Sequence, residues 1–198
     1  MPRLYILSGC NGSGKTTASY TLLPEMLELT QFVNSDEFAK GLSPFDPGKA
    51  SVLASRYMLM KIRYLMERKA DFSIETTLAT RSLVGIINDA RKLGYTIILL
   101  YFWLSSPEMA ITRVRNRVAA GGHNIPENVV RRRYFMGLRY LFETYIPICD
   151  HWILADNTQS PFTVVAEGRR DETSIKNQNT YDKILQIAFP PEEENDNE

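Results

Sequence analysis

Apolar runs and stretches with helical periodicity alternate along most of the chain. The apolar runs are short and rich in Ile, Leu, Tyr and Phe, which is typical of buried parallel strands. Between them, apolar residues recur every three or four positions, as in amphipathic helices. This alternation predicts an α/β fold, a three-layer sandwich in which helices cover both faces of a mostly parallel sheet. The predicted strands are Leu4–Leu7, Phe32–Asn34, Phe72–Thr77, Tyr95–Leu104, Trp152–Leu154 and an edge strand Phe162–Ala166, and the main predicted helices are Lys15–Leu29, Ala50–Lys69, Arg81–Leu93, Ser106–Ala120 and Pro126–Tyr145.

The C-terminal part of the chain is more polar than the rest. Residues 167–179 lack an apolar run, Tyr181–Ala188 has the pattern of a short helix, and five of the last seven residues are acidic. Such composition is typical of flexible segments. We therefore expect one folded domain over residues 1–166, followed by a polar, partly disordered extension over residues 167–198.

Bulk composition narrows the functional classes. The 198 residues include 23 Lys and Arg against 23 Asp and Glu, so the formal net charge is zero. Proteins that coat nucleic acid or bind membrane surfaces need a basic excess, so both roles are disfavoured. The two cysteines, Cys10 and Cys149, fit neither a disulfide framework nor a zinc site. No run is long enough to cross a bilayer and no signal peptide precedes the first strand, so we expect a cytoplasmic protein.

A glycine-rich turn between the first strand and the first helix carries the strongest motif. The segment Gly9-Cys10-Asn11-Gly12-Ser13-Gly14-Lys15-Thr16 fits the phosphate-binding P-loop pattern, and Thr17 follows it. Its glycines let backbone N–H groups approach phosphate oxygens, and the helix behind them adds a positive dipole end. Lys15 is expected to reach the β- and γ-phosphates. The Thr16 hydroxyl is expected to coordinate Mg²⁺, so the motif predicts ATP and Mg²⁺ as cofactors.

Polar residues follow the second and third predicted strands. The carboxylate of Asp36 can accept the proton of an acceptor hydroxyl beside the γ-phosphate. The alternative is that Asp36 caps the next helix, a role that Ser35 can also fill. Glu75 and Thr77 are expected to bind hydroxyl groups of the acceptor, unless they only bond the local backbone. Arg81 is expected to orient Glu75 or to touch the acceptor.

Arginines are concentrated after the fourth predicted strand. Seven of them lie from Arg113 to Arg139, on both sides of the loop Gly121-Gly122-His123. Phosphoryl transfer develops charge on the phosphate oxygens, which arginines on a closing lid neutralise. We expect a helical lid over about residues 113–140 with hinges at the two glycines, while His123 is either a phosphate or adenine contact or an incidental loop residue. We expect Arg117 and Arg133 to bind the transferred phosphate as catalytic residues, and Arg113 and Asn157 to bind the nucleotide.

An ordered set of segments accompanies the P-loop: Asn34-Ser35-Asp36-Glu37, Glu75-Thr76-Thr77-Leu78, Arg113-Val114 with Arg117-Val118, Gly121-Gly122-His123 with Pro126, Arg131-Arg132-Arg133-Tyr134, and Asp156-Asn157. Over about residues 3–158 this set resembles the zeta-toxin-like P-loop kinases, including the bacterial group described as predicted ABC-type ATPases. The resemblance implies a nucleoside-kinase-like fold, Asp36 as the base, and an antitoxin as a protein partner.

The acceptor that the resemblance implies is a nucleotide sugar. Zeta toxins phosphorylate the 3′-hydroxyl of UDP-N-acetylglucosamine and hold it with a Glu-Gly-Thr-x-Arg strand end. Here that segment reads Glu75-Thr76-Thr77-Leu78-Ala79, which keeps the Glu and the Thr but replaces the Gly and the Arg.

Two other functions are compatible with a P-loop. One is an ATP-binding switch or ATPase that has no acceptor. Its form as a transporter ATPase is disfavoured, because the chain has no Leu-Ser-Gly-Gly-Gln motif and no acid directly after the Tyr95–Leu104 strand. A polynucleotide kinase is disfavoured by the neutral charge. The sequence therefore predicts first a Mg²⁺–ATP-dependent kinase of a small-molecule hydroxyl, without a membrane or nucleic-acid partner.

Overall fold

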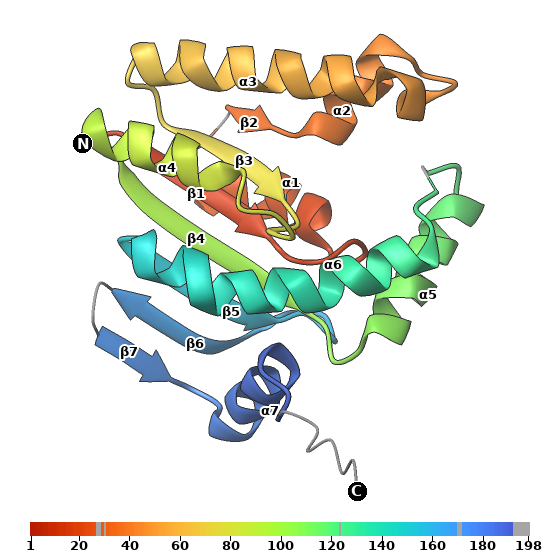
Figure 1. Ribbon diagram of the computed structural model, residues 1–198, viewed down its shortest axis with the longest axis vertical. Helices are drawn as coiled ribbons and strands as arrows, with labels where there is room; N and C mark the ends of the chain where they lie inside the picture. The colour runs from red at the N-terminus through yellow and green to blue at the C-terminus, as the bar shows by residue number, and fades with distance from the viewer. Residues whose placement is uncertain (27–28, 30, 123, 170–171, 192–198) are drawn as a thin grey trace, which may run out of the picture.

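The computed structural model describes residues 1–26, 29, 31–122, 124–169 and 172–191. Within these residues one seven-stranded sheet forms the centre of the molecule (Figure 1). The strands are β1 (Arg3–Ser8), β2 (Phe32–Val33), β3 (Phe72–Thr76), β4 (Thr96–Trp103), β5 (His151–Asp156), β6 (Thr163–Arg169) and β7 (Glu172–Ile175). Their order across the sheet is β2-β3-β1-β4-β5-β6-β7. The first five strands in this order are parallel, whereas β6 and β7 are antiparallel additions at one edge.

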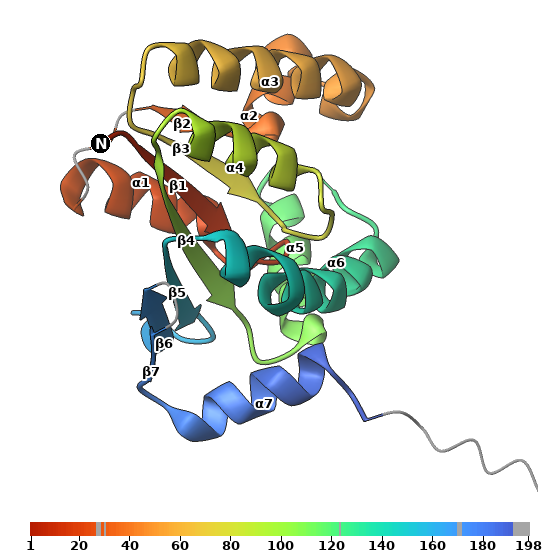
Figure 2. The same cartoon turned by 60° about the vertical axis from the view of Figure 1, so that its left-hand side comes forward.

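Helices cover both faces of the sheet. They are α1 (Lys15–Met26), α2 (Ser35–Leu42), α3 (Ser51–Glu67), α4 (Leu83–Lys92), α5 (Pro107–Ala119), α6 (Glu127–Tyr140) and α7 (Gln178–Ala188). Short 3₁₀ or π turns span Pro47–Ala50, Leu141–Tyr145 and Ile146–Ile148. Figure 2 shows α1 on one face and α4 and α6 on the other. The predicted α/β fold with a mostly parallel sheet and helices on both faces is confirmed.

The apolar alternation along β1 explains how the two faces are filled. Leu4 and Ile6 point into the larger core, which α3, α4, α6 and α7 complete. Tyr5 and Leu7 point into a smaller core on the face that α1 covers, where Ala18 packs against them. Because successive strand residues point to opposite faces, a strand buried on both sides is apolar at every position. This is why Leu4–Leu7 reads as an unbroken apolar run.

The helix that carries the predicted lid arginines begins as its sequence predicts. Ser106 caps α5, because its Oγ accepts a hydrogen bond from the Met109 N–H (3.1 Å), and Pro107 occupies the first helical position. The predicted lid, residues 113–140, covers most of α5 and the whole of α6. The second half of α6 packs on the core through Tyr134 and Leu138, both fully buried.

Residues beyond Ala166 continue the same domain, which corrects the expected boundary. That boundary falls inside β6, which runs to Arg169 and pairs with β7. Glu167 and Lys176 form an ion pair across this hairpin (3.0 Å), so the segment expected to be flexible is largely sheet. Helix α7 packs against α6 and buries Ile184 completely. Residues 192–198, expected to be disordered, lie outside the described residues.

Removal of the buried side chain of α7 tests whether this helix belongs to the folded domain. We expect Ile184→Ala to lower the free energy of unfolding by about 2–4 kcal/mol and the midpoint of thermal unfolding by roughly 5–10 °C, because it leaves a cavity under α7. Circular dichroism during heating measures the change. Gln186→Ala on the exposed side of α7 is the matched control and should shift the midpoint by less than about 2 °C. Equal midpoints for both variants would show that α7 contributes nothing to the core.

Candidate functional site

The P-loop leaves β1 at the carboxyl edge of the sheet and wraps toward the start of α1. Gly9, Gly12 and Gly14 have φ angles of 137°, 80° and 86°. A Cβ atom on Gly12 would lie 2.6 Å from the Ala110 carbonyl oxygen, and one on Gly14 would lie 2.5 Å from Asn157 Nδ2. The loop therefore needs glycine at these positions both for its backbone conformation and for the close approach of its neighbours.

Two groups of the P-loop fit a bound phosphate. The Ser13 hydroxyl is buried and has no hydrogen-bond partner among the described residues. The Lys15 ammonium is buried and donates to the Cys10 carbonyl oxygen (2.8 Å). Burial lowers the pKa of Lys15, and the charge of Glu75 opposes this shift. An anion in the loop would give the hydroxyl a partner and the ammonium a counter-charge, which fits the phosphates of a nucleotide.

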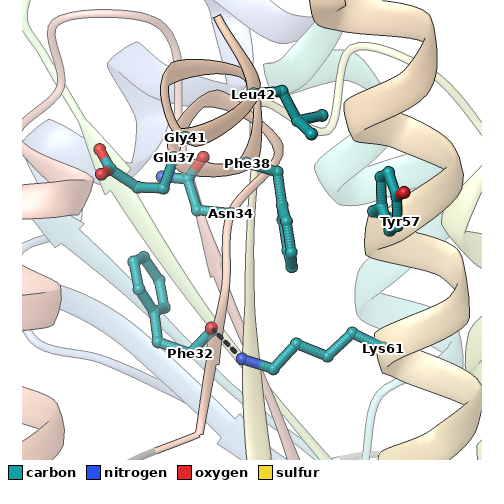
Figure 3. Close-up of a pocket in the computed structure, with 8 residues that line it drawn as sticks. All are labelled: Phe32, Asn34, Glu37, Phe38, Gly41, Leu42, Tyr57 and Lys61. Atoms are coloured by element: carbon teal, nitrogen blue, oxygen red, sulfur yellow. Dashed lines mark hydrogen bonds between the residues drawn. The ribbon is translucent and has the colours of Figure 1, made fainter. Parts of the chain in front are cut away.

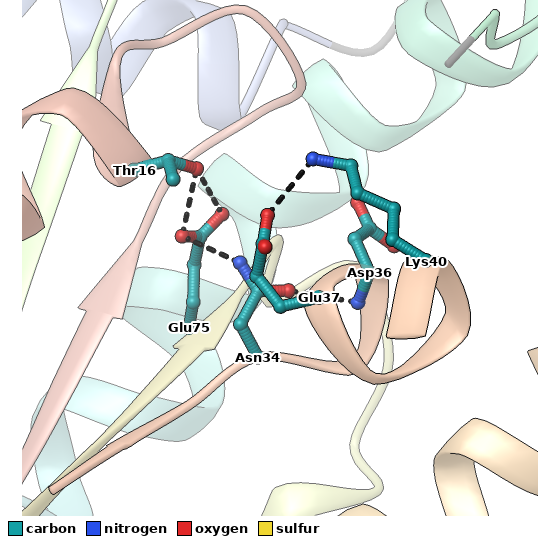
Figure 4. Close-up of polar contacts among 6 residues, drawn as sticks. All are labelled: Thr16, Asn34, Asp36, Glu37, Lys40 and Glu75. Carbon is teal, nitrogen blue, oxygen red and sulfur yellow. Dashed lines mark hydrogen bonds and ion pairs between the residues drawn. The ribbon is translucent and has the colours of Figure 1, made fainter. Parts of the chain in front are cut away.

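A partly buried carboxylate, that of Glu75, lies beside the P-loop threonine (Figure 4). Thr16 Oγ1 donates to Glu75, at 2.9 Å from Oε2 and 3.1 Å from Oε1, and Asn34 Nδ2 donates to Oε2 at 3.0 Å. The parallel register of β1 and β3 sets Leu7 opposite Glu75 and so brings the end of β3 to the loop. Burial raises the pKa of Glu75, while the charge of Lys15 and the hydrogen bond from Thr16 oppose the shift.

Asp36 lies in the first turn of α2 with its carboxylate not used as a cap. The N-cap of α2 is Asn34, whose Oδ1 accepts from the Asp36 N–H (2.8 Å). The alternative that Asp36 or Ser35 caps the helix is therefore wrong, because α2 begins at Ser35 and the preceding Asn34 fills the cap position, which Asn favours as well. Glu37, the next acid, pairs with Lys40 (2.9 Å).

The structure brings Asp36 and two of the predicted arginines to one large polar cavity of about 700 Å³. Arg133 of α6 donates to Asn11 Oδ1 of the P-loop (3.1 Å). Burial lowers its pKa, and the carboxylate of Asp36 opposes this shift. The large polar cavity is lined by Thr16, Thr17, Tyr20, Asn34, Ser35, Asp36, Glu37, Ala39, Lys40, Gly48, Ser51, Ser55, Arg117, Gly122 and Arg133.

A small polar cavity of about 190 Å³ shares part of this lining, namely Asn34, Ser35, Asp36 and Arg133. Its other walls are Asn11, Lys15, Met58, Glu75, Thr76, Thr77, Ser82 and Leu83. Asp36 and Arg133 therefore stand between the P-loop lysine on one side and the open, hydroxyl-lined space on the other. The arrangement can hold a phosphoryl donor and an acceptor hydroxyl next to each other.

Other predicted site residues make structural contacts. Arg113 Nη2 donates to the Thr158 carbonyl oxygen (2.8 Å), which joins α5 to the segment after β5. Asn157 Nδ2 donates to the Ser13 carbonyl oxygen (2.7 Å), which joins that segment to the P-loop. Arg81 forms an ion pair with Glu143 (3.9 Å), and its guanidinium lies over the Tyr140 ring. These contacts are not with Glu75, which Arg81 was expected to orient. His123 lies outside the described residues.

Sequence reasoning missed Asn34, which holds both α2 and Glu75. The available signal was its position at a strand end before a helix, where Asn is a favoured cap. It also missed Lys40, Ser51 and Ser55 in the cavity wall, because nothing in their local pattern sets them apart from surface residues.

The described residues contain no cluster of three or more His, Cys, Asp or Glu that could hold a metal ion. A divalent cation at this site would depend on Thr16, Glu75 and the phosphates of a bound nucleotide. Among the described helices, none combines the length and the apolar character that a membrane span requires.

Comparisons with known proteins find a related family and a related sequence. A family model described as an AAA domain matches residues 4–134. A relative from Haemophilus influenzae, described as an uncharacterized protein, is 29% identical over 126 residues, which are 64% of this chain and 88% of the relative.

Solved structures share the fold at low sequence identity. A chain of the AvrRxo1-ORF1:AvrRxo1-ORF2 complex with sulphate ions has a TM-score of 0.79 at 18% identity, with 98% of this chain and 66% of that chain covered. A structure of that complex with ATP has a TM-score of 0.77 at 19% identity, with 94% of this chain and 64% of that chain covered. A structure of the PezAT toxin–antitoxin system of Streptococcus pneumoniae has a TM-score of 0.69 at 15% identity, with 98% of this chain and 81% of that chain covered. This chain therefore spans about two thirds of the matched chains of the AvrRxo1 complexes, and the likeness shows that these proteins share its α/β fold.

The burial of both cysteines predicts that their thiols are unreactive in the folded protein. Burial raises the pKa of Cys10 to about 11 and that of Cys149 to about 12. At pH 8 only about one Cys10 thiol in a thousand is then a thiolate, which is the reactive form. We expect Ellman's reagent at pH 8 to titrate no thiol of the native protein within minutes and both thiols in guanidinium chloride. A thiol that reacts rapidly in the native protein would contradict the buried placement.

Proposed function

The chain belongs to the AAA domain family whose model spans residues 4–134, and we propose that it is a Mg²⁺–ATP-dependent phosphotransferase. It moves the γ-phosphate of ATP to a hydroxyl group of a small molecule. The observation that supports this most is the position of Asp36 and Arg133, which line both polar cavities between the P-loop and an open, hydroxyl-rich space.

The donor half of the site is the P-loop. Its backbone N–H groups, the orphaned Ser13 hydroxyl and the Lys15 ammonium bind the phosphates of ATP. Arg133 and Arg117 lie on the cavity side of the loop, where they neutralise charge on the transferred phosphoryl group. Arg113 and Asn157 flank the loop on the side of the nucleotide. Mg²⁺, when bound, neutralises phosphate charge from the side of Thr16.

The acceptor half begins at Asp36. The acceptor oxygen attacks the γ-phosphorus, the bond from this phosphorus to the β–γ bridging oxygen breaks, and ADP leaves. The proton of the acceptor hydroxyl passes to the Asp36 carboxylate. This role requires a carboxylate that is exposed to the cavity, and Asp36 meets the requirement because Asn34, not Asp36, caps α2.

We propose a nucleotide sugar such as UDP-N-acetylglucosamine as the acceptor class. The large polar cavity, about 700 Å³, is of a size that takes a ligand of this kind, and Lys40 lines it as a cation for a diphosphate. Thr77 lines the small polar cavity, where it meets a hydroxyl group of the acceptor. The contacts of Arg81 with Glu143 and Tyr140 do not support a role for it in replacing the arginine that this chain lacks at Ala79.

The likeness to PezAT and to the AvrRxo1 complex supports a zeta-toxin-like kinase that works in the cytoplasm and is held inactive by an antitoxin. An ATPase or nucleotide switch without an acceptor would have no use for a cavity of this size beside Asp36. A polynucleotide kinase would need a basic path for the phosphate backbone, and the formal net charge of this chain is zero.

Substitution of the proposed base separates transfer from nucleotide binding. We expect Asp36→Asn to lower the rate of phosphate transfer from ATP to the acceptor by at least about 100-fold, because the amide cannot take the proton, with the affinity for ATP changed less than about threefold. Radiolabelled ATP and a panel of nucleotide sugars measure transfer, and calorimetry measures ATP binding. Glu37→Gln is the matched control on the same helical turn and should keep most of the activity. Full activity of Asp36→Asn on the true acceptor would refute the assigned mechanism.

The hydrogen bond between Thr16 and Glu75 favours a role for Glu75 in holding Mg²⁺ rather than the acceptor. A carboxylate that accepts a hydrogen bond from the proposed Mg²⁺ ligand is also in position to share that metal or its water. In this arrangement Thr76 and Thr77, rather than Glu75, meet the acceptor.

We expect Glu75→Gln to raise the Mg²⁺ concentration for half-maximal activity about tenfold or more, with the KM of the acceptor changed less than about twofold. The affinity of the protein for Mn²⁺ in the presence of ATP, followed by electron paramagnetic resonance, should fall by a similar factor. Thr77→Val should show the reverse pattern, with a raised acceptor KM. A raised acceptor KM for Glu75→Gln at unchanged metal affinity would place Glu75 on the acceptor instead.

A further inference from the structure

Helix α3 carries an apolar surface that no described part of the protein covers. Its inner side is buried through residues such as Ala54, Ile62 and Leu65. A second line of large apolar side chains runs along its outer side at positions i, i+4, i+7 and i+11. These four residues, the apolar stripe, are Leu53, Tyr57, Met60 and Tyr64, with exposed fractions of 47%, 44%, 62% and 52%. Soluble proteins rarely leave such a contiguous row exposed without a use for it.

The apolar stripe runs into a pocket of about 360 Å³ between α2, α3 and β2. Figure 3 shows Phe38 of α2 and Tyr57 of α3 on opposite sides of this apolar pocket, with Phe32 and Lys61 toward its base. Tyr57 belongs to both the stripe and the pocket wall. The lining residues of the apolar pocket are Phe32, Asn34, Glu37, Phe38, Gly41, Leu42, Tyr57 and Lys61.

Cations flank the apolar stripe on both sides. On a helical projection Arg56 and Arg63 lie on one side of it, and Lys61 and Arg68 lie on the other. None of these four cations pairs with a carboxylate within the described part of the chain. The Arg68 guanidinium instead lies 4.7 Å from the centre of the Tyr64 ring, at the end of the stripe. Glu67 is the one acid within α3.

Spacing and charge together define what fits this surface. The i, i+4, i+7, i+11 spacing is that of a coiled-coil seam, so the complementary shape is another helix, over about three turns. The flanking cations favour a helix whose apolar side is bordered by Asp and Glu. A second copy of this chain would bring two sets of these cations together, which is unfavourable.

We propose that the apolar stripe and the apolar pocket bind an acidic amphipathic helix of another protein, which places one large apolar side chain in the pocket between Phe38 and Tyr57. The pocket has room for a large aromatic or aliphatic side chain, and such a buried anchor dominates the binding energy of helix-in-groove interfaces. The inference does not depend on the proposed kinase activity, because it rests on residues of α3 and on a pocket that shares only Asn34 and Glu37 with the walls of the two polar cavities.

A synthetic probe tests this surface on the full chain. The probe is a fluorescein-labelled 21-residue helical peptide with Leu along its apolar side, one central Trp, and Glu at the flanking positions. We expect saturable binding by fluorescence anisotropy at low salt, at least tenfold weaker binding in 0.5 M NaCl, and at least tenfold weaker binding of the same peptide with Lys in place of Glu.

Variants of exposed residues locate the binding. Met60→Glu, at the most exposed position of the stripe, should weaken binding at least tenfold, and Tyr57→Ala should do so through loss of the pocket wall. Val52→Glu is the matched control, because Val52 is 68% exposed on α3 but lies outside the stripe, and it should change binding less than twofold. Thermal unfolding of each variant separates loss of binding from loss of fold.

Three outcomes would overturn the proposal: no binding of the acidic peptide, equal binding to the Met60→Glu variant, or self-association of the wild-type chain that Met60→Glu abolishes. The last of these, seen by sedimentation velocity, would assign the surface to a second copy of this chain.

Discussion

The arrangement of the site depends on the hydrogen bond from the Thr16 hydroxyl to the Glu75 carboxylate. That hydrogen bond in turn depends on the pairing of strands in the central sheet. It joins the start of α1 to the end of β3, which are far apart in the sequence and adjacent only because β1 and β3 pair in parallel register. Asn34 extends the contact to the end of β2 through its amide and caps α2 with its carbonyl oxygen. One small network thus fixes the P-loop and the helix that carries Asp36 relative to each other.

Burial of charged groups at the site destabilises their charged forms. Burial shifts the pKa of Lys15 downward and that of Glu75 upward, so each charge is stabilised mainly by the other. Ser13 adds a buried hydroxyl without a partner among the described residues. Groups of this kind destabilise the folded protein unless a ligand satisfies them, and the rigid parallel sheet beneath them keeps them in place. The arrangement is therefore expected where a site is prepared for an anion rather than where stability is the only constraint.

The sequence predicted features that follow from local patterns and could not predict those that depend on distant pairing. The P-loop and the strand ends at Asp36 and Glu75 follow from short motifs, but the partner of Glu75 depends on the register of β1 and β3. Arg81 lies four residues beyond Thr77, yet the chain turns at Leu78 with a left-handed backbone (φ 53°), so helical spacing does not apply there. The hairpin of β6 and β7 was missed because β7 is exposed at every position and so lacks an apolar face.

The two halves of the site differ in how firmly they are held. The donor half rests on β1, β3 and β4, whose side chains are largely buried on both faces of the sheet. The acceptor half rests on α2, which buries only Ala39 among its residues, and on β2, which is two residues long and pairs only with β3 among the described strands. An element with so few buried contacts opens and shifts at a lower free-energy cost than the sheet does. Substitutions in α2 and α3, which line part of the large polar cavity, are therefore expected to change the acceptor at a lower cost in stability than substitutions in the strands that hold the P-loop.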